Sequence, residues 1–137
     1  AVRESEERLH LILESVEDYA IFTTDLNGTI TRWNAGAVQV FGYTQTEAVG
    51  QSIDITFTPE DVTGGIPAQE RERALETGRA INERWHLKKD GTRFFASGVT
   101  TLLRDSYVHG FVKIARDLTF QKKVEEALID ADRKKNE

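Results

Sequence analysis

The chain of 137 residues contains no cysteine, no excess of positive charge and no long apolar run. The lack of cysteine excludes a disulfide framework, a thiolate nucleophile and cysteine metal ligands, and it is compatible with a reducing cytoplasm, where we expect the domain to lie. Because the apolar runs are short and the first residues, AVRESEERL, are polar, we expect neither direct membrane insertion nor a signal peptide. The net charge of −5 argues against a nucleic-acid partner, whose binding needs clustered Lys and Arg.

Candidate catalytic residues are also few. The three histidines, His10, His86 and His109, lie in different predicted elements. No Ser/His/Asp arrangement and no His/carboxylate spacing typical of a metal site accompanies them. Gly64-Gly65 lacks the Lys and Ser/Thr of a phosphate-binding loop. We therefore expect a domain without catalytic residues and without a metal site.

Two strand-like pairs flank the dipeptides Asn27-Gly28 and Asp90-Gly91, which favour two-residue hairpin loops. Both positions of such a loop adopt positive φ, which Gly takes freely and Asn or Asp tolerates. The second hairpin contains Trp85, Phe94 and Phe95, so we expect the core to form against it. The predicted strands cover residues 19–24, 29–33, both arms of 84–103, and 107–116.

Capping residues mark several short helices between the two hairpins. Asn34, Thr44 and Thr58 can each accept a hydrogen bond from the first turn of a following helix, and Gly42 suits a left-handed helix end. A longer helix over residues 66–77 has little apolar surface, and we expect it to be held loosely. This order of elements predicts an α+β fold, in which a five-stranded antiparallel sheet carries short helices on one face.

Both ends of the chain have the hydrophobic periodicity of amphipathic helices. We predict one helix over residues 1–17 and another over residues 119–137, the latter being the start of a coiled coil. For the first helix, packing on its own domain and pairing with a second chain are both open, because about two heptads do not decide between them. We expect a homodimer through these helices, and the residues of its predicted seam are Leu9, Ile12, Val16, Val124 and Leu128.

Three stretches of the sequence, in this order and at this spacing, resemble a PAS domain with its carboxy-terminal PAC portion. They are ERLHLILESVEDYAIFTTDLNGTITRWNAGAVQVFGYTQTEAVG, LKKDGTRFFASG and GFVKIARDLT, and a charged helix follows the last. The resemblance implies a PAS/PAC sensory domain at residues 18–118. Such domains occur most often in bacterial sensor histidine kinases of two-component phosphorelays, so an effector domain is expected downstream in the same chain.

The family resemblance also implies a pocket between the sheet and its helices. When the hairpin is aligned with those of flavin-binding LOV domains, His86 and Ala96 fall where two Asn side chains bind the flavin, but Ala96 cannot form that hydrogen bond. Hydrophobicity would turn Trp85 inward, whereas this alignment turns His86 inward, and alternation along a strand places the two on opposite faces. An ordinary hydrogen-bonded role is the other interpretation of His86. The candidate pocket residues are Ile21, Phe41, Phe57, Leu75, His86, Ala96 and Ala115.

The resemblance limits the cofactors that this pocket could hold. Haem-binding PAS domains that sense oxygen carry the iron ligand on the long helix before the third strand, and residues 59–78 contain no His, Cys or Met. Haem bound in that way is therefore disfavoured. A LOV-type flavin adduct needs a cysteine and is excluded. Non-covalent flavin, another small molecule and an empty pocket all stay open.

The triplet Asp117-Leu118-Thr119 resembles the D-x-T signature with which the family joins its last strand to the output helix. Asp117 can cap that helix, tie the linker to the sheet, or do both. The resemblance therefore assigns Asp117 and Thr119 to signal transmission. Our hypothesis is a sensory or relay module that passes ligand-driven or interaction-driven changes through this junction. The alternative is a ligand-free module for dimerisation and spacing.

Overall fold

The structure, a computed structural model, describes residues 19–135. The predicted amino-terminal helix, with Leu9, Ile12 and Val16, lies outside the described residues. The strands are β1 (Ala20–Asp25), β2 (Ile30–Trp33), β3 (Arg79–Leu87), β4 (Arg93–Arg104) and β5 (Val108–Asp117). The helices are α2 (Ala35–Phe41), α3 (Gln45–Ala48), the 3-10 helix η1 (Ile53–Thr56), α4 (Pro59–Thr63), α5 (Ile66–Thr77) and α6 (Thr119–Lys135).

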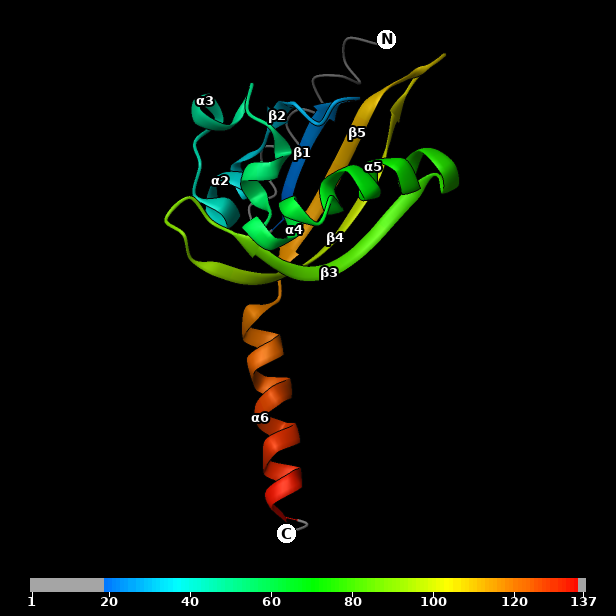
Figure 1. Cartoon of the computed structure of the whole chain (residues 1–137). Helices are drawn as coiled ribbons and strands as arrows, with labels where there is room; N and C mark the ends of the chain where they lie inside the picture. The colour runs from blue at the N-terminus through cyan, green and yellow to red at the C-terminus, as the bar shows by residue number, and fades with distance from the viewer. Residues whose placement is uncertain (1–18, 136–137) are drawn as a thin grey trace, which may run out of the picture.

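The five strands form one antiparallel sheet in the order β2-β1-β5-β4-β3. The helices α2 to α5 lie on one face of this sheet, and α6 leaves its lower end and points away from the domain (Figure 1). The predicted α+β fold is thereby confirmed, including the short helices on one face and the helix after β5. We call the face toward α2 to α5 the inner face and the opposite one the outer face.

The short helices begin at the capping residues that the sequence indicated. Asn34 and Thr44 accept hydrogen bonds from the amides of Ala37 and Glu47, and the Glu47 carboxylate accepts one from the Thr44 amide. Such caps satisfy amide groups that have no partner within the first helical turn. Gly78, at φ 93°, ends α5 at the predicted residue.

The hairpin loops differ from the predicted two-residue type. No described non-glycine residue has a positive φ, so Asn27 and Asp90 do not adopt the conformation that such a loop requires. Instead, the Asp25 and Lys88 amides donate across the loop to Thr29 and Thr92 carbonyls, and only Gly28 and Gly91 are left-handed. Three-residue loops with a left-handed glycine close the hairpins. The Lys89 amide also donates to the Phe41 carbonyl, a contact that ties the second loop to α2.

Aromatic rings fill the inner side of the sheet. Phe41 contacts the rings of Phe22, Trp33 and Phe94 at centroid distances of 5.8, 5.5 and 5.4 Å. These four side chains are fully buried, and they join α2 to β1, β2 and β4. Edge and tilted arrangements of this kind stabilise a core beyond the burial of their area, by about 0.5–1.5 kcal/mol per pair.

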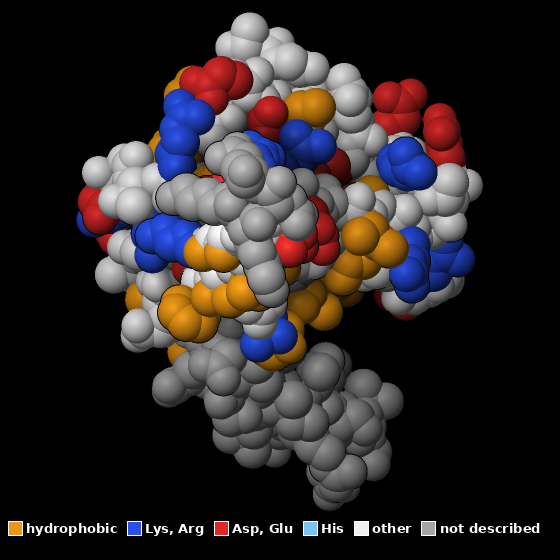
Figure 2. Space-filling model, turned by 90° about the horizontal axis from the view of Figure 1, so that it is seen from below, with side chains coloured by type: hydrophobic (Ala, Val, Ile, Leu, Met, Phe, Trp, Pro, Cys, Tyr) orange, Lys and Arg blue, Asp and Glu red, His pale blue; other side chains and the backbone are white. Residues whose placement is uncertain are grey.

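The outer face carries hydrophobic side chains that stay partly exposed, among them Tyr19, Ile81, Trp85 and Ile114. A hollow of about 460 Å³ lies among residues of this face, including Val99 and Leu118. Seen from the end at which α6 leaves the domain, hydrophobic side chains gather on one side of the molecule, and charged ones are spread over the rest (Figure 2). No helix within residues 19–135 is long and apolar enough to cross a membrane.

Candidate ligand site and signalling junction

Hydrophobicity and the family alignment disagreed on whether Trp85 or His86 of β3 points inward, and the structure decides between them. His86 is 1% exposed and lies on the inner face, with its ring 4.9 Å from Phe57 and 6.1 Å from Phe94. Trp85 lies on the outer face, where it is 41% exposed and packs edge-on against Phe95. The family alignment therefore predicted the facing of this strand, and hydrophobicity alone did not.

Most of the candidate pocket residues lie together on the inner side. Phe41, Phe57, His86, Ala96 and Ala115 are all buried there.

The structure corrects the placement of the other two candidates. Ile21 alternates with the buried Ala20 and Phe22 and so points to the outer face. Leu75 is 51% exposed, because Ala74 faces the sheet and the next residue lies about 100° further around the helix.

His86 is held as a neutral imidazole. Its Nδ1 lies 2.7 Å from the Thr56 carbonyl oxygen, which can only accept, so Nδ1 carries the proton. Burial, and secondly the charge of Lys113, lowers the pKa of His86 to about 3. The remaining nitrogen, Nε2, is buried and has no hydrogen-bond partner among the residues that the structure describes.

The core contains a charged cluster that the sequence pattern did not predict. Lys113 of β5 is only 2% exposed, and its Nζ lies 3.0 Å from Oε2 of Glu70 on α5 and 5.0 Å from the centre of the Phe57 ring. Burial lowers the pKa of Lys113, and the Glu70 carboxylate opposes that effect. A signal for this cluster was present, since the alternation that turns Ala115 inward also turns Lys113 inward.

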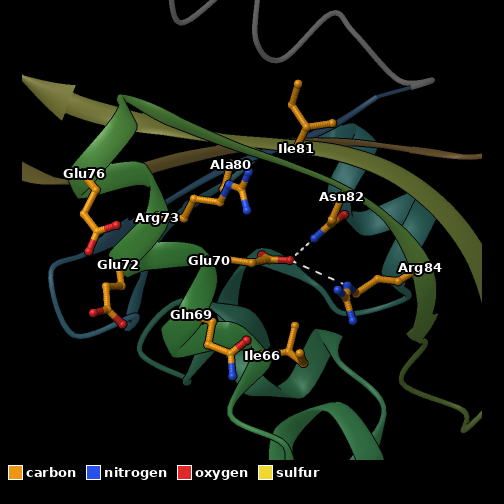
Figure 3. A pocket seen from close by; sticks show the side chains of 10 residues that line it. All are labelled: Ile66, Gln69, Glu70, Glu72, Arg73, Glu76, Ala80, Ile81, Asn82 and Arg84. Carbon is orange, nitrogen blue, oxygen red and sulfur yellow. Dashed lines mark hydrogen bonds and ion pairs between the residues drawn. The ribbon is translucent and has the colours of Figure 1, made fainter.

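The second oxygen of Glu70 faces β3 (Figure 3). Oε1 accepts a hydrogen bond from the Asn82 amide group and lies 3.8 Å from Nε of Arg84. Arg84 also donates to Asp61, at 3.1 Å. Glu70 thus connects α5 to β3 and β5 at once. Apart from Glu70, only Pro67 and Ala74 are buried along α5, so this carboxylate is a main anchor of the helix.

The free space around this cluster is divided into two parts. A cavity of about 10 Å³ lies beside Lys113, between Phe57 and Glu70, with room for about one water molecule. An open groove of about 350 Å³ runs between α5 and β3, with Glu70, Asn82 and Arg84 in its wall. Pockets for cofactor-sized ligands usually measure about 300–1,000 Å³. The packing of the core therefore leaves the groove as the larger ligand-accessible space on the inner side.

No group of three or more His, Cys, Asp or Glu side chains within the described part of the chain is placed to hold a metal ion. Charged side chains in this region are paired with one another instead. The core cluster can accept or donate hydrogen bonds and can change its pairing, but it does not contain the nucleophile–base arrangement that covalent catalysis requires.

Residues 117–119, the candidate signalling junction, bind the start of α6 to the hairpin through Phe95. The amide of Leu118 donates to the Phe95 carbonyl oxygen at 2.7 Å, and the Thr119 hydroxyl accepts from the Phe95 amide at 2.9 Å. The Asp117 carboxylate accepts from the Thr119 amide at 2.9 Å. Nζ of Lys122, one turn into α6, lies 4.4 Å from the centre of the Phe95 ring. Asp117 therefore caps the helix, while Leu118 and Thr119 make the direct contact with the sheet.

The family model of the PAS domain matches residues 18–120. The chain belongs to the PAS domain family. PAS domains are generally sensory modules that are not themselves catalytic.

The relatives of this PAS domain include signalling proteins. Two-component system protein A of Emericella nidulans is 39% identical over 126 residues, which are 91% of this chain and 18% of that protein. The PAS domain of a protein from Colwellia psychrerythraea has a TM-score of 0.78 and 26% identity over 84% of this chain and 98% of its own. A domain of a sensory box sensor histidine kinase/response regulator from Geobacter sulfurreducens has a TM-score of 0.74 and 21% identity, over 85% and 97% of the two chains.

Proposed function

We propose that this PAS domain is a sensory or relay module of a two-component signalling protein, such as a sensor histidine kinase of the bacterial type. It passes a ligand-driven or interaction-driven change through Asp117-Leu118-Thr119 to α6 and on to an effector domain in the same chain. Its cytoplasmic location and its homodimerisation through the terminal helices belong to the same proposal. The chain spans 18% of the length of Two-component system protein A, so a protein of that kind has ample length for an effector domain.

The observation that carries this proposal is that Phe95 of β4 is hydrogen-bonded to the start of α6 through both of its backbone groups. Both the amide and the carbonyl of Phe95 bond to the two residues that precede and begin α6. A shift of β4 therefore moves the first turn of α6 with it. At the other end of the path, Glu70 ties the weakly buried helix α5 to Lys113 on β5, the strand that leads into Asp117. A rearrangement at α5 has a continuous route to the output helix.

Two substitutions test this junction in the full-length protein. Asp117→Ala removes the cap, and Thr119→Val removes the acceptor of the Phe95 amide at nearly constant volume. Each should cost the domain about 0.5–3 kcal/mol of folding free energy. We expect both variants to stay folded by circular dichroism and to lose the response of the output activity to its input. Thr101→Val, the same substitution on β4 and outside the junction, is the matched control.

Hydrogen exchange adds a local measurement to this test. Amides of residues 119–122 should lose protection in Thr119→Val and keep it in Thr101→Val. Unchanged signalling in both junction variants, with α6 loosened, would remove the proposed route.

The alternative is a ligand-free module that spaces and dimerises neighbouring domains. The small volume beside Lys113 favours it, whereas the polar groups that converge on Glu70 favour a sensory site. An absorbance spectrum and native mass spectrometry of the purified chain distinguish the two. A bound flavin, haem or colourless ligand supports the sensory function, and a ligand-free protein whose Thr119→Val variant still signals normally supports the spacer.

A further inference from the structure

Glu70 occupies a site whose other members are all suited to binding a carboxylate. Lys113 supplies an ammonium group from β5, Asn82 supplies an amide donor from β3, and Arg84 supplies a guanidinium group from the same strand. These three donors belong to the rigid sheet, whereas the carboxylate comes from α5, which has little else buried. The donors would therefore remain in place if α5 moved.

The pairing within this site is incomplete. Nε of Arg84 is buried and has no hydrogen-bond partner among the described residues, and its distance to Glu70 Oε1 is 3.8 Å. A buried donor without an acceptor is costly, and a carboxylate that is free to adjust its position can approach it more closely than one attached to a helix. Glu70, Asn82 and Arg84 line the open groove between α5 and β3 (Figure 3), and Lys113 lines the small cavity on which Glu70 also borders.

We infer that Lys113, Asn82 and Arg84 form a binding site for a small organic carboxylate, in which Glu70 is the resident occupant that the ligand displaces. Displacement releases α5 from β5 and β3, and this release is the input change that reaches the junction at Thr119. The inference rests on the proposed sensory function and names the ligand class for it. A carboxylate fits better than a neutral ligand, because three donors, two of them charged, converge where Glu70 now lies.

His86 lies near this cluster but is not one of its donors. Its buried Nε2 is an acceptor and cannot donate to a carboxylate, so His86 is not part of the donor set. Glu72 and Glu76 line the same groove, at the end away from Asn82 and Arg84 (Figure 3). Glu72 therefore offers a matched control, since it lies on the same helix and carries the same charge.

The test uses chemical rescue of Glu70→Ala in the chain of residues 1–137. This substitution removes the atoms of a CH₂–COO⁻ group, so acetate fits the space that it leaves. We expect sodium acetate to raise the melting temperature of Glu70→Ala and to bind it at least tenfold more tightly than the wild type, as measured by calorimetry. Acetamide and sodium chloride at matched concentrations should not, and acetate should not act on Glu72→Ala beyond its effect on the wild type.

A second set of measurements covers the case in which Glu70→Ala is unfolded. In that case acetate should restore its folding, and Glu70→Gln, which retains the volume and loses the charge, should also gain affinity for acetate. Adding Lys113→Met to either variant should abolish the gain. In the wild type, saturating acetate should increase hydrogen exchange in α5.

Acetate binding that is equal in the wild type, in both Glu70 variants and in the Lys113→Met combinations would overturn the site. Unchanged α5 exchange in the wild type would overturn displacement as the input. Neither result depends on signalling, so the proposed function stands or falls separately with the Thr119→Val measurement.

Discussion

His86 and Lys113 place two titratable side chains in one core, and both lose solvation there. For His86, the loss of solvation makes the stability of the folded protein depend on pH. Its pKa is about 3 in the folded protein and 6.5 in the unfolded chain, so between these values the unfolded state binds more protons. The contribution of His86 to stability is therefore complete above pH 6.5 and declines as the pH falls toward 3.

We predict that this decline can be removed by His86→Gln, which retains a donor for the Thr56 carbonyl and does not titrate. Between pH 6.5 and pH 5 the wild type should lose up to about 2 kcal/mol of unfolding free energy through this group. Urea denaturation at both pH values should show a smaller loss in the variant.

The control for this pH dependence is His109→Gln. His109 lies at the surface, 2.9 Å from Asp105, and outside the core that holds His86. Its variant should retain the pH dependence of the wild type. An identical slope in the wild type and His86→Gln would contradict the assignment to His86.

At the scale of elements, the Lys113–Glu70 pair joins α5 to β5 through buried charges. Removing one member of a buried pair leaves the other uncompensated and usually costs about 3–5 kcal/mol, whereas replacing both by apolar residues often costs much less. We expect Lys113→Met to lower the unfolding free energy by about that amount, and Lys113→Met with Glu70→Met to recover most of it.

Equilibrium urea denaturation of both single variants and the double variant measures the coupling between these two side chains. Arg93→Met breaks the exposed pair with Glu60 and should have a much smaller effect, because solvent screens both of its charges. Additive effects of Lys113→Met and Glu70→Met would show that the pair does not couple the two elements.

At the scale of the molecule, α6 extends away from the sheet (Figure 1), and several of its apolar side chains are exposed. Val124 is 42% exposed and Leu128 is 66% exposed, and they occupy the core positions of the predicted heptad. A second copy of the helix would bury both. This arrangement supports the proposed dimer.

We predict that Leu128→Lys weakens self-association of the chain at least tenfold, because it places a charge in the seam. Analytical ultracentrifugation over a concentration series measures this change. Glu125→Lys introduces the same side chain on the flank of the helix and should have little effect. A wild type that stays monomeric throughout the series would contradict dimerisation through α6.

Residues close together in the chain were sufficient to predict where most helices begin and end and which strands pair as hairpins. Asn34, Thr44 and Thr58 bond to amides three residues away, so their role depends only on neighbours in the sequence. The same holds for Gly78 at the end of α5. The family resemblance added the inward facing of His86 and the junction at residues 117–119, which the structure describes at the level of individual hydrogen bonds.

Tertiary structure decided the features that join distant parts of the chain. Lys113 and Glu70 are 43 residues apart in sequence, and their pairing exists only because α5 lies over β3 and β4 on the inner face, within reach of the Lys113 side chain of β5. The hairpin loops likewise follow contacts such as that of Lys89 with Phe41, and not dipeptide preference alone. Local composition sets which segments are helices or strands, because caps and alternation act over a few residues. The charged centre of the inner face arises from packing, because only packing brings its donors and their carboxylate together.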